Sequence, residues 1–80
     1  MIKPVDYSAV IAPLKEEQDH KGSLIHMGRI VAIGDSPSRN KGHEVGAIVL
    51  YSKRDCLYFR NENETTPLVL IDTRDILARA

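Results

Sequence analysis

The side chains with reactive chemistry are few in this sequence, and they are widely separated. The three histidines, His20, His26 and His43, lack the close spacing with one another or with cysteine that zinc sites use. The one cysteine, Cys56, begins an apolar run, where a buried structural thiol is expected. We therefore interpret the histidines as surface residues and expect neither a metal site nor thiol chemistry.

Other patterns that support catalysis are also missing. Glu16 and Glu17 lie in a charged stretch that is typical of a solvated loop. Ser8, Ser23 and Ser36 have no nearby base in a recognisable arrangement, and the glycines form no phosphate-binding motif. The sequence thus predicts a protein that is not an enzyme and that needs no cofactor.

The length and composition predict one small domain over residues 1–80. Hydrophobic residues make up 42% of the chain but aromatic residues only 5%, so the core must consist mainly of Val, Ile and Leu. A core of this size is modest, and small domains of this kind gain stability from oligomerisation. A single cysteine cannot form an internal disulfide, which favours a reducing compartment.

The charge balance bears on partners and location. The chain has 11 basic and 11 acidic residues, without the basic excess that proteins use to hold phosphate backbones. No apolar run is long enough for a signal peptide or for a membrane span of roughly 20 residues. We expect a cytoplasmic protein that binds neither nucleic acid nor membrane.

Short apolar runs rich in β-branched residues alternate with polar segments, and this pattern predicts an all-β fold. Asp72 followed by Asp75 predicts a single helical turn capped by Asp72, and Gly46 permits a positive φ at a strand entry. Because several runs are apolar on both faces, we expect a small barrel or sandwich. The predicted strands contain residues 10–12, 29–33, 47–51, 56–59 and 67–71.

The order of these segments resembles the GroES-type co-chaperonin (chaperonin-10) family over nearly the whole chain. The similarity is to a shortened, divergent member, of the kind that viruses carry. The matching segments are Ile2-Lys3-Pro4-Val5-Asp6 with Val10–Ala12, Met27–Gly34, Glu44–Tyr51, Leu68–Ile71 and Asp75-Ile76-Leu77-Ala78.

This resemblance implies a GroES-like β-barrel that forms a homo-oligomeric ring, a heptamer in the family. The ring would cap a large GroEL-type chaperonin, whose ATP would control the association. A mobile loop over 16–28 would dock on the chaperonin, and a shortened roof loop over 35–43 would leave the dome partly open. The docking residues implied are Gly22, Ser23, Leu24, Ile25, His26 and Met27, with Leu24 and Ile25 as the apolar anchors.

In the family, terminal strands of neighbouring subunits pair. The interface residues implied here are Ile2, Pro4, Val5, Ile76 and Leu77. Two simpler interpretations stay open, namely that the chain ends are frayed and that Leu24 and Ile25 begin the next strand and pack in the core. The docking loop also lacks the polar stretch that follows the apolar anchors in the family, because Gly28 and the next strand follow at once.

A second class of function is a monomeric small β-barrel adaptor or oligonucleotide-binding module. Such a module needs a groove with exposed aromatic and cationic side chains. The zero net charge weighs against this interpretation. The residues available for such a face are Tyr51, Tyr58, Phe59, Lys53, Arg54 and Arg60.

Overall fold

The computed structural model describes residues 3–14, 25–36, 40, 42–60 and 67–80. Six antiparallel strands form one sheet, in the order β4-β5-β1-β2-β3-β6. The predicted all-β class is therefore confirmed. The strands are β1 (Ser8–Pro13), β2 (Ile25–Ile33), β3 (Ile48–Ser52), β4 (Leu57–Phe59), β5 (Leu68–Asp72) and β6 (Ile76–Arg79).

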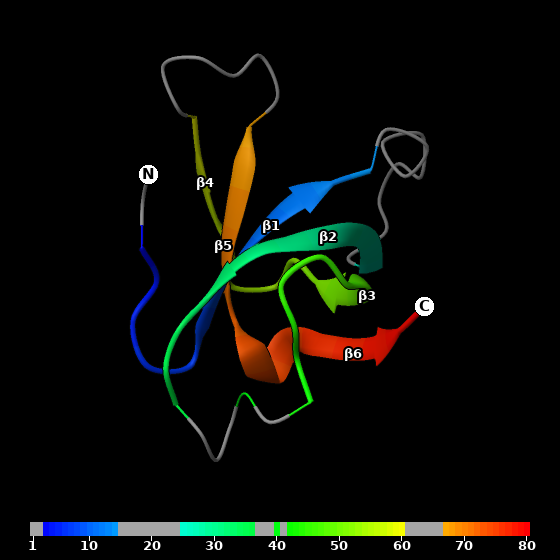
Figure 1. The fold of residues 1–80 in the computed structure, drawn as a ribbon. Coiled ribbons are helices and arrows are strands. Elements are labelled where there is room, and N and C mark those ends of the chain that lie inside the picture. The colour runs from blue at the N-terminus through cyan, green and yellow to red at the C-terminus, as the bar shows by residue number, and fades with distance from the viewer. Residues whose placement is uncertain (1–2, 15–24, 37–39, 41, 61–66) are drawn as a thin grey trace.

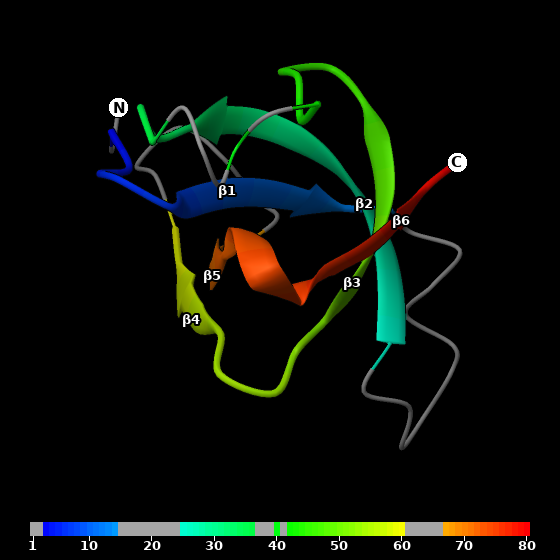
Figure 2. The ribbon, with the colours of Figure 1, turned by 90° about the horizontal axis from the view of Figure 1, so that it is seen from below.

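The sheet is strongly curved but does not close into the expected barrel. Figures 1 and 2 show β4 and β6 running in different directions at its two ends. In the described part of the chain, these two edge strands do not pair with each other. The prediction of a barrel was thus right in strand content and curvature but wrong in closure, because both edge strands are short and diverge.

The core lies on the concave side of the sheet. Alternate residues of each strand point to the same face, and one set of them packs into a single cluster. The largest side chains that are almost completely buried are Tyr51, Ile11, Ile30, Val49 and Val69. Ile33 and Ile76 pack against this cluster at its margin. Aliphatic residues fill most of the core, as the composition predicts, and the one large aromatic side chain among them is Tyr51.

The N-terminal segment is held against the end of β2. A Cβ atom at Gly34 would overlap the Asp6 carbonyl oxygen and would lie 2.8 Å from the Val5 carbonyl carbon, so this contact requires glycine. The backbone of Ser36 and the side chain of Asn40 both donate to the Asp6 carbonyl, at 3.0 and 2.8 Å. The turn before β1 is therefore fixed by several contacts.

Two local predictions from the sequence are confirmed. Gly46 has φ +97°, a left-handed backbone conformation that residues with a Cβ atom adopt only with strain. A single 3₁₀ turn, η2 (Thr73–Asp75), follows β5, and the side chain of Asp72 caps it by accepting from the backbone N–H of Arg74 at 2.8 Å. The carboxylate of Asp75 accepts from the guanidinium of Arg54 at 3.3 Å.

The contact between Arg54 and Asp75 joins two segments that lie outside the strands. Arg54 lies in the connection between β3 and β4, and its guanidinium is 3.3 Å from the carboxylate of Asp75, which is buried just before β6. The side chain of Arg54 is itself 70% exposed, so solvent weakens the attraction. The ion pair joins the segments that lead into the two edge strands.

We predict that Arg54→Ala lowers the free energy of unfolding by about 1 kcal/mol, because the buried carboxylate of Asp75 loses its cation. Chemical denaturation at fixed protein concentration measures this change. Arg74→Ala, which removes an exposed pair with Asp72, is the control and should cost less than about 0.5 kcal/mol. Equal effects of the two substitutions would show that the Arg54–Asp75 contact has no special role.

Candidate functional site

The C-terminal half of the expected docking segment lies in a strand. β2 begins at Ile25, so the expected loop over 16–28 ends earlier than predicted, and residues 25–28 pair with β3. Ile25 is opposite Ser52 in this pairing, and its side chain is 49% exposed. Ile25 thus begins the strand, as the simpler interpretation had it, but does not pack in the core. Gly22, Ser23 and Leu24 lie outside the described residues.

The next two residues of the predicted docking set face opposite sides of β2. His26 is partly buried, and its ring centroid lies 6.4 Å from that of Tyr51, at an interplanar angle of 39°. Met27 pairs with Leu50 on the other face of the sheet, where it is partly exposed. Ile25 and Met27, two of the apolar residues in the docking set, therefore share the convex face.

The predicted interface residues divide into exposed and buried ones. Val5 is 69% exposed and Leu77 is 53% exposed. Pro4 is buried, and Ile76 packs against the core of its own chain. Ile2 lies outside the described residues. Of this set, the structure leaves Val5 and Leu77 available for contact with another molecule.

The face required for nucleic-acid stacking is not assembled. Tyr51 is fully buried, and Arg54 contacts Asp75. Tyr58 is 55% exposed, and the ammonium nitrogen of Lys53 lies 5.0 Å from the centroid of its ring. Phe59 is partly buried and Arg60 is exposed. Tyr58 and Lys53 form a cation–π pair, whereas a stacking platform uses several exposed rings along a groove.

The described residues with reactive side chains do not cluster. No group of three or more His, Cys, Asp or Glu side chains within the described ranges could hold a metal ion. Cys56, expected to be buried in a strand, is partly buried immediately before β4 and packs against the core. Burial raises the pKa of the Tyr51 hydroxyl well above its ordinary value, and the nearby Tyr58 and Cys56 add to this shift. Within the described ranges, the features that stand out at the surface are exposed apolar side chains.

Two charged residues that the sequence patterns did not single out stand among these apolar side chains. Arg29 lies on the convex face of β2, two residues beyond Met27. Asp6 lies between the exposed Val5 and Tyr7 and has φ +51°. The alternation of residues along β2 could have revealed Arg29, but the position of Asp6 depends on tertiary contacts with Gly34 and Asn40.

These features define a small all-β protein with an open antiparallel sheet, whose convex face carries mostly apolar, partly exposed side chains. A comparison with models of known protein families finds no match for this chain, and a comparison with curated proteins finds none either. In the described part of the chain, no helix has the length and apolar character needed to cross a membrane.

Proposed function

We propose that this chain is a subunit of a GroES-type co-chaperonin ring, a non-catalytic cytoplasmic binding protein that caps a large chaperonin during ATP-dependent protein folding. The observation that carries the proposal is the exposed aliphatic side chain of Ile25 at the first residue of β2. It directly follows the polar segment 15–22 and the sequence Gly22-Ser23-Leu24, the position at which the family carries its docking residues. The whole-chain order of motifs supports the same function.

The energetics of such a contact suit a reversible lid. Burial of one aliphatic side chain contributes roughly 1.5–3 kcal/mol, whereas ordering the backbone costs on the order of 1–2 kcal/mol per residue. A single segment would bind weakly, but several segments on one ring act through their effective concentration. The assembly can therefore bind well while each contact stays reversible.

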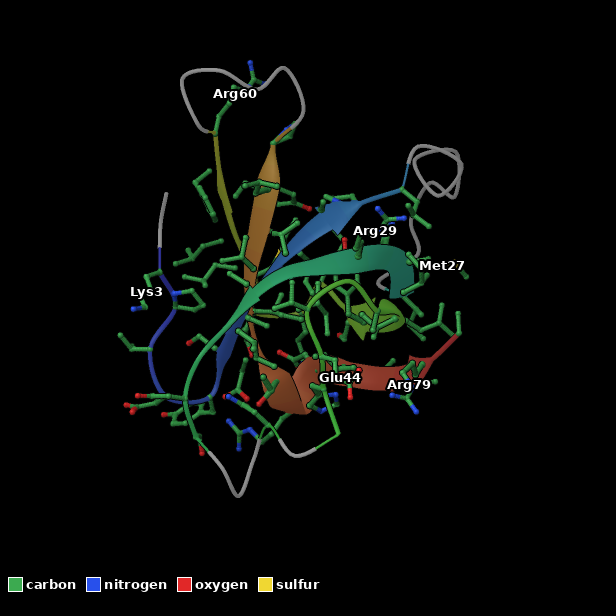
Figure 3. All side chains as sticks on the ribbon, in the orientation of Figure 1. Lys3, Met27, Arg29, Glu44, Arg60 and Arg79 are labelled. Atoms are coloured by element: carbon green, nitrogen blue, oxygen red, sulfur yellow. The ribbon has the colours of Figure 1, made fainter. Side chains whose placement is uncertain are left out.

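The positions of the two chain ends support a ring. Figures 1 and 2 both place the first described residues and β6 on opposite sides of the molecule, and Figure 3 shows Lys3 far from Arg79. A head-to-tail arrangement repeats one pair of different surfaces and can close into a ring. The N-terminal segment of one subunit could then meet the C-terminal strand of the next.

The proposed docking is tested by co-sedimentation with a large GroEL-type chaperonin in the presence and absence of ATP. We predict that Leu24→Ser/Ile25→Ser reduces capture at least about tenfold, the loss expected when buried aliphatic contacts are replaced by hydroxyls. Native mass should stay unchanged, because Ile25 lies outside the core.

The matched control is Leu57→Ser, which alters an aliphatic side chain of 65% exposure on the far edge strand and should bind like the wild type. Undiminished capture by the double variant would show that the anchors are assigned wrongly. Disassembly of the variant would instead place these residues in the subunit's structural framework.

The alternative, a monomeric adaptor or oligonucleotide-binding module, has one observation in its favour, the exposed Tyr58 beneath Lys53. Fluorescence anisotropy with a labelled single-stranded oligonucleotide would test it. Binding that falls with rising salt and is lost in Tyr58→Ala would favour this module over the co-chaperonin.

A further inference from the structure

The convex face of β2 and β3 carries mostly apolar side chains, most of which are partly exposed. Directly paired residues of neighbouring strands share a face of the sheet. Met27 pairs with Leu50, which pairs with Ala78 of β6, and Arg29 pairs with both Ala12 and Ile48. We call these six residues the outer patch; they are Ala12, Met27, Arg29, Ile48, Leu50 and Ala78.

The outer patch lies on the side of the sheet opposite the core. Val49 and Tyr51, which alternate with Ile48 and Leu50 along β3, are both fully buried in the core cluster. One-sided antiparallel sheets normally present polar residues to water, whereas here the one charged member is Arg29. Figure 3 shows Met27 and Arg29 on β2. An apolar face of this kind is suited to contact with another molecule.

The charge of Arg29 indicates what the covering molecule must carry. Arg29 is exposed, and no ion pair joins it to any carboxylate among the described residues. A cation surrounded by aliphatic side chains is best matched by a carboxylate flanked by apolar groups, because contact removes the pair from water together with the apolar surface.

The same chain displays a surface of that kind. Val5 and Tyr7 are 69% and 43% exposed, and Asp6 between them is exposed and forms no ion pair within the described ranges. We call these three residues the acidic turn. It is held rigidly, since the Val5 carbonyl accepts from Ser8 at 3.0 Å and the Asp6 carbonyl accepts from Ser36 and Asn40. A rigid turn loses little conformational entropy when it docks.

The acidic turn and the outer patch lie too far apart to meet within one chain. Asp6 is packed against Gly34 at the end of β2, and Arg29 precedes Gly34 by five residues, which is roughly 16 Å along a strand. The two surfaces therefore favour contact between copies, and because they differ from each other, the contact is head-to-tail. The equal numbers of basic and acidic residues leave no net repulsion between copies.

We propose that the acidic turn of one copy docks on the outer patch of a second copy, with Asp6 paired to Arg29. The inference rests on the ring in the proposed function and specifies the interface that builds it. It adds Asp6, Tyr7 and the convex face around Arg29 to an interface otherwise expected from terminal strands alone. It also places the second copy beside β6, whose Ala78 belongs to the patch and whose Leu77 is exposed.

Native mass spectrometry and sedimentation velocity of the full chain test the proposal. Asp6→Asn and Arg29→Gln should each weaken assembly at least about tenfold, as expected for loss of one partner of a desolvated ion pair. Asparagine suits the positive φ of Asp6. The controls, Asp35→Asn and Arg60→Gln, remove exposed charges outside both surfaces and should assemble like the wild type.

A mixing experiment tests the head-to-tail geometry. Val5→Ser/Asp6→Asn removes the acidic turn and keeps the outer patch, whereas Met27→Ser/Arg29→Gln does the reverse. Each variant alone should be monomeric at concentrations where the wild type assembles. An equimolar mixture should form a one-to-one heterodimer and nothing larger, because the heterodimer has no second matched pair of surfaces. Thermal unfolding of each variant checks that its fold is intact.

The outcomes separate this inference from the proposed function. If the wild type assembles and the Asp6 and Arg29 variants assemble equally well, the interface is wrong and the ring stands. Absence of a heterodimer from the mixture likewise overturns the pairing. If the wild type is monomeric at every concentration tested, the ring itself is wrong and the interface falls with it. If the wild type assembles but is not captured by the chaperonin, that result would count against the proposed function alone.

Discussion

Gly28→Ala should destabilise the fold more than Gly42→Ala or Gly46→Ala, where an added methyl group meets no atom within 4 Å. A Cβ atom at this position would overlap the Ile11 side chain and would lie 2.9 Å from the Ala12 carbonyl oxygen and 3.1 Å from the Tyr51 ring. These neighbours are backbone and buried core atoms, which cannot move aside cheaply. We expect a loss of about 3 kcal/mol, the upper range for overpacking, and a melting temperature lower by more than about 10 °C.

Differential scanning calorimetry at fixed protein concentration measures this loss. The matched control is Gly46→Ala, since Gly46 has φ +97° but no atom within 4 Å of the added methyl group. That substitution introduces backbone strain alone, worth about 1 kcal/mol. If both variants lost the same stability, close approach at Gly28 would not limit the packing of β2 against β1.

Several of the strands could be predicted from the sequence. The apolar run predicted over 29–33 lies within β2, and those over 47–51 and 67–71 each begin one residue before a strand of the structure. They are short, β-branched and bounded by turn-forming residues, so local propensity and burial favour the same structure. Gly46 and the Asp72 cap were predictable for the same reason, because each depends on a few neighbouring residues.

Features that depend on contacts between distant segments could not be predicted in this way. The open edge between β4 and β6 results from strand curvature and from the short lengths of both strands. The exposure of Ile25 depends on the face of β2 to which it is assigned, and an apolar run shows no alternation that would decide this. The position of Asp6 depends on its contact with Gly34, which is 28 positions away in the chain.

The docking anchor and the outer patch have different positions in the sheet, which makes their proposed roles separable. Ile25 and Met27 lie on the same face of β2, but Ile25 is at the strand's first residue whereas Met27 pairs with the centre of β3. Substitution of Ile25 should therefore affect chaperonin capture and spare assembly. Substitution of Arg29 should impair assembly first, and would reduce capture through the loss of multivalency.

Tyr51→Phe should change how stability depends on pH. The Tyr51 hydroxyl is buried without a hydrogen-bond partner in the described structure, and burial raises its pKa above the ordinary value. In the unfolded chain the phenol ionises near pH 10, so above that pH the unfolded state binds fewer protons than the folded one. The free energy of unfolding should then fall with rising pH, by up to about 1.4 kcal/mol per pH unit.

The Tyr51→Phe variant lacks this titrating group, so its stability should fall less steeply above pH 10 than that of the wild type. At neutral pH it should be about 1 kcal/mol more stable, because the substitution removes a buried hydroxyl without a partner and leaves the ring packed. Urea denaturation between pH 8 and about pH 11 measures both effects. The control is Tyr58→Phe, in which the exposed ring changes and Tyr51 remains, so the steep fall should persist. A destabilised Tyr51→Phe variant at neutral pH would reveal that the hydroxyl is hydrogen-bonded in solution, and that a water or a polar group completes the core beside His26.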